Sequence, residues 1–344
     1  MNNKHKILLK FIFLMSFLTL SLAVSAKQSS WCKTKPVKFA APTWESALFY
    51  TELAKFIVQH GYECKTELIT GSKNITETAL VSGDLEVWME QWEGQNVITK
   101  KAAEAGKVKL IGSLLNGGTL EGWFVPEYLV KGDSAKGIKA QAPDLKSVAD
   151  LKKYKHLFIS PENPKKGRFL NCPTGWECEK TNSQKLKAYK LTDDFENFRP
   201  GTGGALNAEI TSMVKRGKAV AFYYWSPSGI LGKYKFYQLT EPKFNDKCWK
   251  TLYNTTTNET CGSASPSTNL AAGVSIAFYK GAPEIIKFLG KLQMEPDTLN
   301  AIIGEINDTK VANLVLVKRF LKENNDVLRN WVPSEIADKV ASKL

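Results

Sequence analysis

Four of the nine tryptophans stand where α/β proteins commonly bind small ligands. They end predicted strands or lie in loops that lead into predicted helices, and they are Trp44, Trp92, Trp176 and Trp225. Indole faces that converge on one point attract a positive charge that cannot donate hydrogen bonds, which describes a quaternary ammonium. Packing in a core is the alternative for any single ring. We interpret the remaining five tryptophans as structural: Trp31, Trp88, Trp123, Trp249 and Trp331.

The stretch NCPTGWECEK places Trp176 between two cysteines in a tight loop. If Cys172 and Cys178 are bonded, the loop holds the ring rigidly, and a preorganised wall lowers the ordering cost of binding. The backbone N–H groups of Glu177 and Cys178 lie at the start of the next predicted helix, where they can hold a carboxylate. The sequence therefore predicts a site that takes a methylated cation and an anion side by side.

An exported α/β enzyme is the alternative class, and the sequence favours it less. The chain has three histidines, and none of them lies in a catalytic pattern. The G-x-S-x-G, P-loop and H-E-x-x-H motifs are missing from the sequence. No C-x-x-C or H-x-x-x-H spacing supports zinc. We therefore expect no catalytic residue, no metal and no cofactor, and a protein that is not an enzyme.

The first 26 residues have the pattern of a secretory signal peptide. Three lysines precede or enter the apolar run FIFLMSFLTLSLAV, and small residues at Val24 and Ala26 predict cleavage before Lys27. The apolar run is short for a membrane anchor. No cysteine directly follows the cleavage site for lipid attachment, so we expect a lipid-free protein in a bacterial periplasm.

All six cysteines follow the predicted cleavage site, and an even number is typical of disulfides formed in an oxidising compartment. Six cysteines allow about fifteen pairings. Among them we predict two local pairs, Cys172–Cys178 and Cys248–Cys261, and the remaining pair Cys32–Cys64.

The formal net charge of +13 comes from lysines scattered along the chain. A nucleic-acid-binding protein would gather them on one face or along one helix. In an exported chain the scatter is typical of a solvated basic surface, so we expect no nucleic-acid partner.

Strands and helices alternate in two blocks, which predicts two lobes built on mostly parallel sheets. The strands expected in the first block are 37–42, 64–71, 84–92 and 107–115. Its expected helices are 44–60 and 74–82, and the first of them has Thr43 as its N-cap and ends at Gly61. The second block has expected strands at 156–160 and 219–225 and helices at 147–154, 181–191 and 205–217. Then follow a loop at 241–268, a buried strand at 271–283 and helices to the end.

This organisation predicts a signal peptide at 1–26, a first lobe of 27–122 plus 270–344, and a second lobe of 123–269. The helical tail would return to pack on one lobe. A cleft between the lobes is the usual place for a small ligand.

Three segments resemble the glycine betaine-binding proteins of ABC-type osmoprotectant importers: NCPTGWECEK followed by LKAYKL, AVAFYYWSP, and GDLEVWMEQW. The most specific motif is C-x-x-G-W-x-C, and the resemblance follows the element order over most of the chain. It implies the type II periplasmic binding-protein fold, in which two lobes joined by two crossing segments close on a ligand. It also implies a monomer that delivers its ligand to an inner-membrane permease.

The resemblance implies roles for particular residues. Trp92, Trp176 and Trp225 match the cage tryptophans of the family. The loop amides of Glu177 and Cys178 match its carboxylate-binding amides.

The chain departs from the family pattern at three positions. A histidine that helps to hold the carboxylate in some relatives should fall near Asn96 and is absent. Trp44 is an additional candidate ring. Glu121, in the segment LEGWF that we expect to cross between the lobes, is an additional candidate carboxylate, and a surface or hinge charge is the alternative.

A site-facing Glu121 would repel a carboxylate and favour choline or trimethylamine N-oxide, so these compounds and dimethylsulfoniopropionate stay candidates beside glycine betaine. A sensor that binds the same ligand stays open beside a transporter.

Overall fold

A computed structural model describes residues 29–254, 256, 259–309 and 312–344. The predicted signal peptide lies outside the described residues. Within the described part of the chain, no helix combines the length and the apolar character needed to cross a bilayer.

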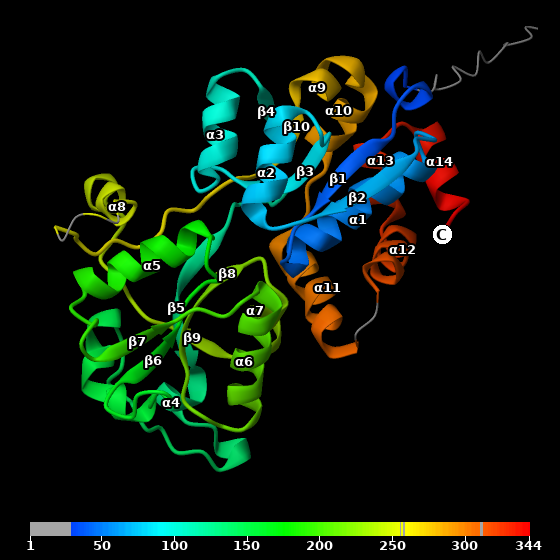
Figure 1. Cartoon of the computed structure of the whole chain (residues 1–344). Helices are drawn as coiled ribbons and strands as arrows, with labels where there is room; N and C mark the ends of the chain where they lie inside the picture. Colours follow the sequence, from blue (N-terminus) through cyan, green and yellow to red (C-terminus); the bar gives the residue numbers. More distant parts are fainter. Residues whose placement is uncertain (1–28, 255, 257–258, 310–311) are drawn as a thin grey trace, which may run out of the picture.

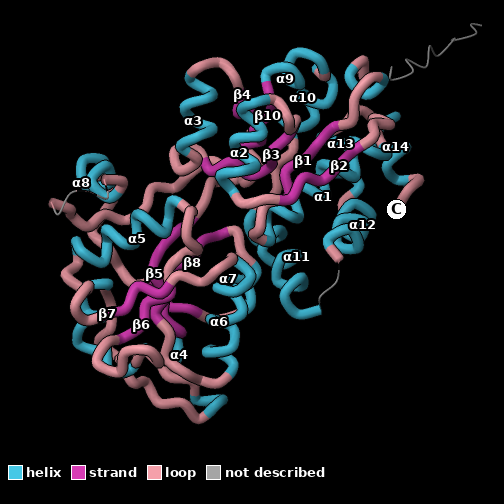
Figure 2. The backbone as a smooth tube through the Cα atoms, in the orientation of Figure 1, coloured by secondary structure: helices cyan, strands magenta, loops and turns pink. Residues whose placement is uncertain are grey.

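Over these residues the chain forms two five-stranded mixed sheets, one in each lobe (Figures 1 and 2). The first sheet, in the order β2-β1-β3-β10-β4, contains β1 (Val37–Ala41), β2 (Thr66–Thr70), β3 (Val87–Trp92), β4 (Val108–Ile111) and β10 (Leu270–Ser275). The second sheet, in the order β7-β6-β8-β5-β9, contains β5 (Leu120–Pro126), β6 (Gly167–Leu170), β7 (Phe195–Phe198), β8 (Ala221–Ser226) and β9 (Phe236–Gln238).

Each sheet has one strand that runs against the rest. In the first sheet β10 pairs antiparallel with β3 and β4, while β1 pairs parallel with β2 and β3. In the second sheet β5 pairs antiparallel with β8 and β9, while β6 pairs parallel with β7 and β8. The predicted fold class, two lobes with mixed and mostly parallel sheets, is confirmed.

The chain passes between the two sheets after β4 and again before β10, and these two crossing segments lie side by side. The backbone N–H of Thr119 donates to the Thr268 carbonyl at 3.0 Å, and the Thr268 N–H donates to Thr119 Oγ1 at 3.0 Å. The segment LEGWF does not cross, because from Leu120 it pairs with β8. The lobe boundaries given above stay a prediction.

Helices cover the faces of both sheets (Figure 1). Those that precede the first crossing are α1 (Glu45–His60), α2 (Lys73–Ser82) and α3 (Val97–Glu104). Those of the second lobe are α4 (Glu127–Lys131), α5 (Glu177–Ala188), α6 (Gly203–Lys215), α7 (Gly229–Lys233) and α8 (Asp246–Leu252). Short 3-10 helices are η1 (Trp31–Lys33), η2 (Ser134–Lys136) and η3 (Val148–Leu157).

The helical tail returns to the first lobe. It consists of α9 (Ile276–Gly281), α10 (Pro283–Lys291), α11 (Pro296–Thr309), α12 (Asn313–Glu323), α13 (Asn325–Trp331) and α14 (Ser334–Ala341). Helices α11, α12 and α14 all contact α1. Helix α11 also packs against α7 of the second lobe, so the tail touches both lobes (Figure 1).

Several expected elements are corrected by the structure. The strand expected at 156–160 is the end of η3 and a single bridge from Ile159 to Gly167; a short apolar run does not distinguish a strand from a helix end, and Ile159 is exposed. The N-cap of α1 is Trp44 rather than Thr43. The run at 271–283 divides into β10 and α9 because the Ser275 hydroxyl accepts from the Phe278 N–H and caps a helix.

The expected loop at 241–268 contains α8, which Asn245 caps by accepting from the Cys248 N–H. The disulfides of the structure are the three chosen above: Cys32–Cys64, Cys172–Cys178 and Cys248–Cys261.

Candidate functional site

A pocket lies between the two lobes, with about 430 Å³ of empty space that is partly open to solvent. Its lining from the first lobe is Trp44, Lys73, Trp92, Gln95 and Asn96, and its lining from the second lobe is Trp176, Glu177, Cys178, Tyr223 and Trp225. The structure thus brings together all four tryptophans singled out in the sequence. It also places both residues of the predicted amide pair, Glu177 and Cys178, at the same pocket.

Strand topology brings the rings of the first lobe together. Trp44 follows β1 and caps α1, and Trp92 is the last residue of β3. Because β1 and β3 are parallel, their carboxyl ends lie at the same sheet edge. Trp225 reaches the pocket from β8 of the facing lobe.

Trp176 links the rings of the two lobes. Its ring centroid lies 5.5 Å from that of Trp44 in the first lobe and 5.5 Å from that of Trp225 in the second, both in edge-to-face geometry. Gly203 makes room for it, because a Cβ at that position would lie 3.0 Å from Trp176 Cη2. The three rings therefore form one continuous aromatic wall across the cleft.

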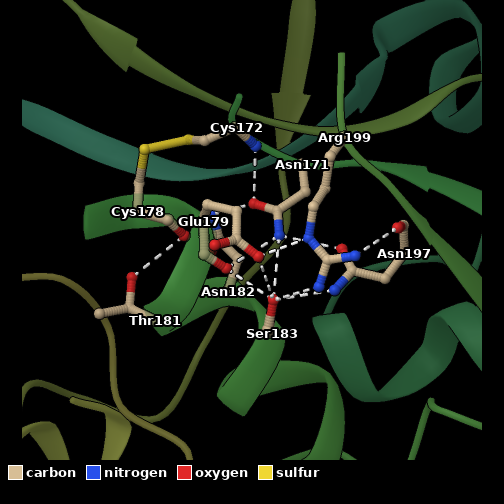
Figure 3. Close-up of polar contacts among 9 residues, drawn as sticks. All are labelled: Asn171, Cys172, Cys178, Glu179, Thr181, Asn182, Ser183, Asn197 and Arg199. Atoms are coloured by element: carbon tan, nitrogen blue, oxygen red, sulfur yellow. Dashed lines mark hydrogen bonds and ion pairs between the residues drawn. A yellow bond between two sulfur atoms is a disulfide. The ribbon is translucent and has the colours of Figure 1, made fainter. Parts of the chain in front are cut away.

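The base of the cystine loop is held by a polar network (Figure 3). Asn171 Oδ1 accepts from the Cys172 N–H at 2.7 Å and from Asn182 Nδ2 at 3.0 Å. Asn171 Nδ2 donates to the Glu179 carbonyl at 3.0 Å and to Asn197 Oδ1 at 2.9 Å. With the Cys172–Cys178 disulfide, these bonds anchor the loop on both sides of Trp176.

Glu90 lies directly behind two of the rings, and sequence reasoning missed it. Its Oε1 accepts hydrogen bonds from Trp44 Nε1 at 2.7 Å, Trp92 Nε1 at 3.1 Å and Ser46 Oγ at 2.9 Å. The residue is fully buried, and burial raises its pKa to about 7 against the opposing effect of these hydrogen bonds. The available signal was its spacing, since residues i and i+2 of a strand share a face and Trp92 is two residues on.

Glu121 lies one layer behind the lining. Its carboxylate accepts from Gln95 Nε2 of the first lobe and from the Tyr223 hydroxyl of the second, and both donors line the pocket. It faces Trp225 across the β5–β8 pair. Burial raises the pKa of Glu121, and burial together with the Glu121 charge raises the pKa of Tyr223. The structure gives Glu121 a place between the lobes rather than on the pocket surface.

Lys73 is a second residue that the sequence reasoning missed. It is the first residue of α2 and lines the pocket, with Nζ 3.6 Å from Oε1 of the buried Glu77. The cystine loop lies close to it, because a Cβ on Gly175 would be 4.0 Å from Nδ2 of the next residue, Asn74. Lys73 therefore lines the pocket near the cystine loop, with its ammonium group paired to Glu77.

Asn96 lies near the position where the resemblance implies a histidine. It lines the pocket, and its Nδ2 donates to Gln91 Oε1. The Glu177 carboxylate is paired with Lys180 at 3.2 Å. Lys73 lines the pocket together with Glu177 and Cys178, the first two residues of α5, where backbone N–H groups typically have no acceptor within the helix.

Fold and pocket define a two-lobed solute-binding protein of the type II periplasmic class. The family model for the substrate-binding domain of ABC-type glycine betaine transport systems matches residues 35–323, and the chain belongs to that family. The glycine betaine/proline betaine-binding periplasmic protein of Escherichia coli (strain K12) is 27% identical over 163 residues, 47% of this chain and 46% of that protein. A glycine betaine-binding periplasmic protein of Dickeya dadantii is 34% identical over 62 residues, 18% of each chain. The matched segments thus span less than half of the curated relatives.

Solved structures share the fold over nearly the whole chain. A glycine betaine and L-proline-binding protein from Borrelia burgdorferi has a TM-score of 0.67 at 15% identity, covering 89% of this chain and 100% of that one. A choline-binding ABC-transporter protein in complex with choline has a TM-score of 0.68 at 16% identity, covering 90% of this chain and 97% of that one. A lactococcal protein closed on glycine betaine has a TM-score of 0.66 at 17% identity, covering 86% of this chain and 99% of that one. At such identities the likeness establishes the two-lobed fold.

Proposed function

We propose that this protein is the periplasmic substrate-binding component of an ABC importer, and that it captures a small methylated amine in the pocket between its lobes. The observation that carries the proposal is the convergence of four indoles from both lobes on one pocket. The ring faces would hold the methylated cation. The protein would act as a monomer without catalysis and deliver its ligand to an inner-membrane permease. Relatives named as glycine betaine-binding periplasmic proteins support this role.

Among methylated amines, we propose a zwitterion such as glycine betaine as the preferred ligand. Lys73 and the N–H groups of Glu177 and Cys178 offer positive charge and donors at one end of the pocket. Glu121 would repel a carboxylate, but its side chain lies behind the pocket lining and accepts hydrogen bonds from Gln95 and Tyr223. Choline is the second candidate, because a structural neighbour is a choline-binding protein in complex with choline.

The direct test is isothermal titration calorimetry on the mature chain. The panel is glycine betaine, dimethylsulfoniopropionate, choline, carnitine, proline and trimethylamine N-oxide. We expect micromolar or tighter binding of at least one methylated amine and much weaker binding of proline. A protein that binds none of the methylated compounds would contradict the proposed function.

Replacing Lys73 with methionine tests the anion end. We expect glycine betaine to bind about tenfold more weakly, since a charge-assisted contact to its carboxylate contributes about 1.5 kcal/mol. Choline has no carboxylate, so its dissociation constant should stay within about twofold, which also shows that the variant is folded. The matched control is Lys180→Met, which removes a lysine that pairs with Glu177 but does not line the pocket. Equal losses for both ligands would contradict this role.

Closure of the lobes on the ligand is a further expectation. Rings on both lobes can contact one ligand together only when the cleft is closed, so binding stabilises the closed state. Small-angle X-ray scattering should show a smaller radius of gyration at saturating glycine betaine. An unchanged radius, with binding confirmed by calorimetry, would show that the ligand contacts one lobe only.

A further inference from the structure

We propose that Glu90 is the positioning residue that determines the specificity of this pocket for cations. In this role it holds the indoles of Trp44 and Trp92 in place and sets a negative charge behind them, so that the pocket prefers a cation to a neutral molecule of the same shape. The inference rests on the proposed function, because it concerns the same pocket.

The first argument is geometric. One carboxylate oxygen, Glu90 Oε1, receives the N–H groups of both first-lobe indoles, at 2.7 Å from Trp44 and 3.1 Å from Trp92. An indole has a single polar group, so this bond sets the rotation of each ring once the ring is packed. The two rings are therefore preorganised before a ligand arrives, which reduces the ordering cost of binding.

The second argument concerns charge. Both oxygens of Glu90 are buried, and Oε2 has no hydrogen-bond partner among the described side chains and backbone. A buried carboxylate with an unsatisfied oxygen costs free energy, so its retention calls for a compensating interaction. A methylated cation in the pocket would supply one, because charges separated by low-dielectric protein interact more strongly than in water.

The third argument is the local backbone. Glu90 has a φ of 61°, in the left-handed region that residues other than glycine rarely adopt. The pairing of β10 with β3 changes register beside it, between Ala271 and Gly273. Such conformations persist where the surrounding structure requires them, and here the result is a carboxylate aimed at two ring edges.

The charge of Glu90 also links binding to pH. Burial raises the pKa of Glu90, and the Glu45 carboxylate of α1 adds to the rise. The Glu90 charge in turn raises the pKa of the buried Tyr50 hydroxyl in the same helix. With its pKa raised to about 7, Glu90 is largely protonated in the free protein below that pH. A bound cation favours the ionised form, so cation affinity should rise as the pH increases through 7.

The experiment compares a cation with its neutral isostere, choline with 3,3-dimethylbutan-1-ol, in the full mature chain by calorimetry and competition. In the wild type the ratio of the two dissociation constants should favour choline more at pH 8 than at pH 6, by about fivefold. Glu90→Gln keeps an acceptor for the indole N–H groups and removes the charge. This variant should weaken choline binding about tenfold at pH 8 and leave the dissociation constant of the isostere within about twofold. It should also abolish the pH dependence of the choline preference.

Two variants serve as controls. Ser46→Ala removes the third hydrogen bond to Glu90 Oε1 but keeps the charge, so the preference for choline should persist. Because that bond lowers the pKa of Glu90, the pH profile of the preference should shift to higher pH rather than disappear. Glu86→Gln changes another largely buried glutamate, which accepts from the Lys38 N–H at 2.8 Å and does not line the pocket, and it should leave both ligands unaffected.

Equal losses of affinity for choline and for its neutral isostere in Glu90→Gln would overturn the proposal. So would a choline preference that is flat with pH in the wild type, a measurement that needs no variant and holds even if Glu90→Gln does not fold. A wild-type protein that binds no methylated amine would instead contradict the proposed function, which keeps the two failures distinct.

Discussion

Replacement of Trp176 by alanine is expected to weaken binding of the methylated ligand by about 30-fold, or about 2 kcal/mol. The ring contacts Trp44 in the first lobe and Trp225 in the second, so its loss removes a desolvated cation-binding face and opens the wall between the lobes. Calorimetry with glycine betaine or choline measures the change. Trp225→Ala should have an effect of similar size.

Trp249→Ala is the matched control for these two variants. This indole belongs to α8 of the second lobe and packs near Phe244 and Tyr253, outside the pocket. Its removal should leave the affinity within about twofold. Near-wild-type titrations for both Trp176→Ala and Trp225→Ala would exclude the aromatic cage.

Replacement of Gly229 by alanine is expected to lower the melting temperature by about 5 °C and to weaken ligand binding. Gly229 begins α7, and a Cβ there would lie 2.6 Å from both Cα and N of Gly304 in α11. Backbone atoms at that distance cannot be accommodated by rotating a side chain, so the two helices must separate. Because α11 also packs on α1, this separation would shift the second lobe relative to the first.

The matched control is the reciprocal change, Gly304→Ala. A Cβ on Gly304 would lie 3.6 Å from the Gly229 carbonyl oxygen, which is an ordinary contact, and alanine has a higher helix propensity than glycine. This variant should be neutral or stabilised by up to about 1 kcal/mol. Differential scanning calorimetry and ligand titration of both variants give the comparison. Equal changes in melting temperature and ligand affinity for Gly229→Ala and Gly304→Ala would show that the close approach of α7 to α11 does not hold the lobes in place.

Much of the candidate site was predictable because its signals are local in the sequence. Trp44 comes shortly after one strand and Trp92 ends another, and the carboxyl ends of these two strands share a sheet edge, so strand alternation alone predicted that the two rings meet. The cystine loop carries Trp176, its disulfide and its helix start within ten residues, 171–180. The pattern of strands and helices likewise predicted two lobes with mostly parallel sheets and a helical tail.

The tertiary structure alone decided which charges stand at the pocket. Glu90 meets Trp44, Glu121 joins Gln95 to Tyr223, and Lys73 faces a loop about a hundred residues later, all contacts between segments far apart in the chain. Residue patterns show which side chains share a strand face or a helix turn, whereas strand pairing and lobe packing set which faces meet. For the same reason the segment that begins at Leu120 could not be recognised as a strand without its partner β8. Residue types and spacing thus determined the class of ligand chemistry, and packing determined the charges that select among its members.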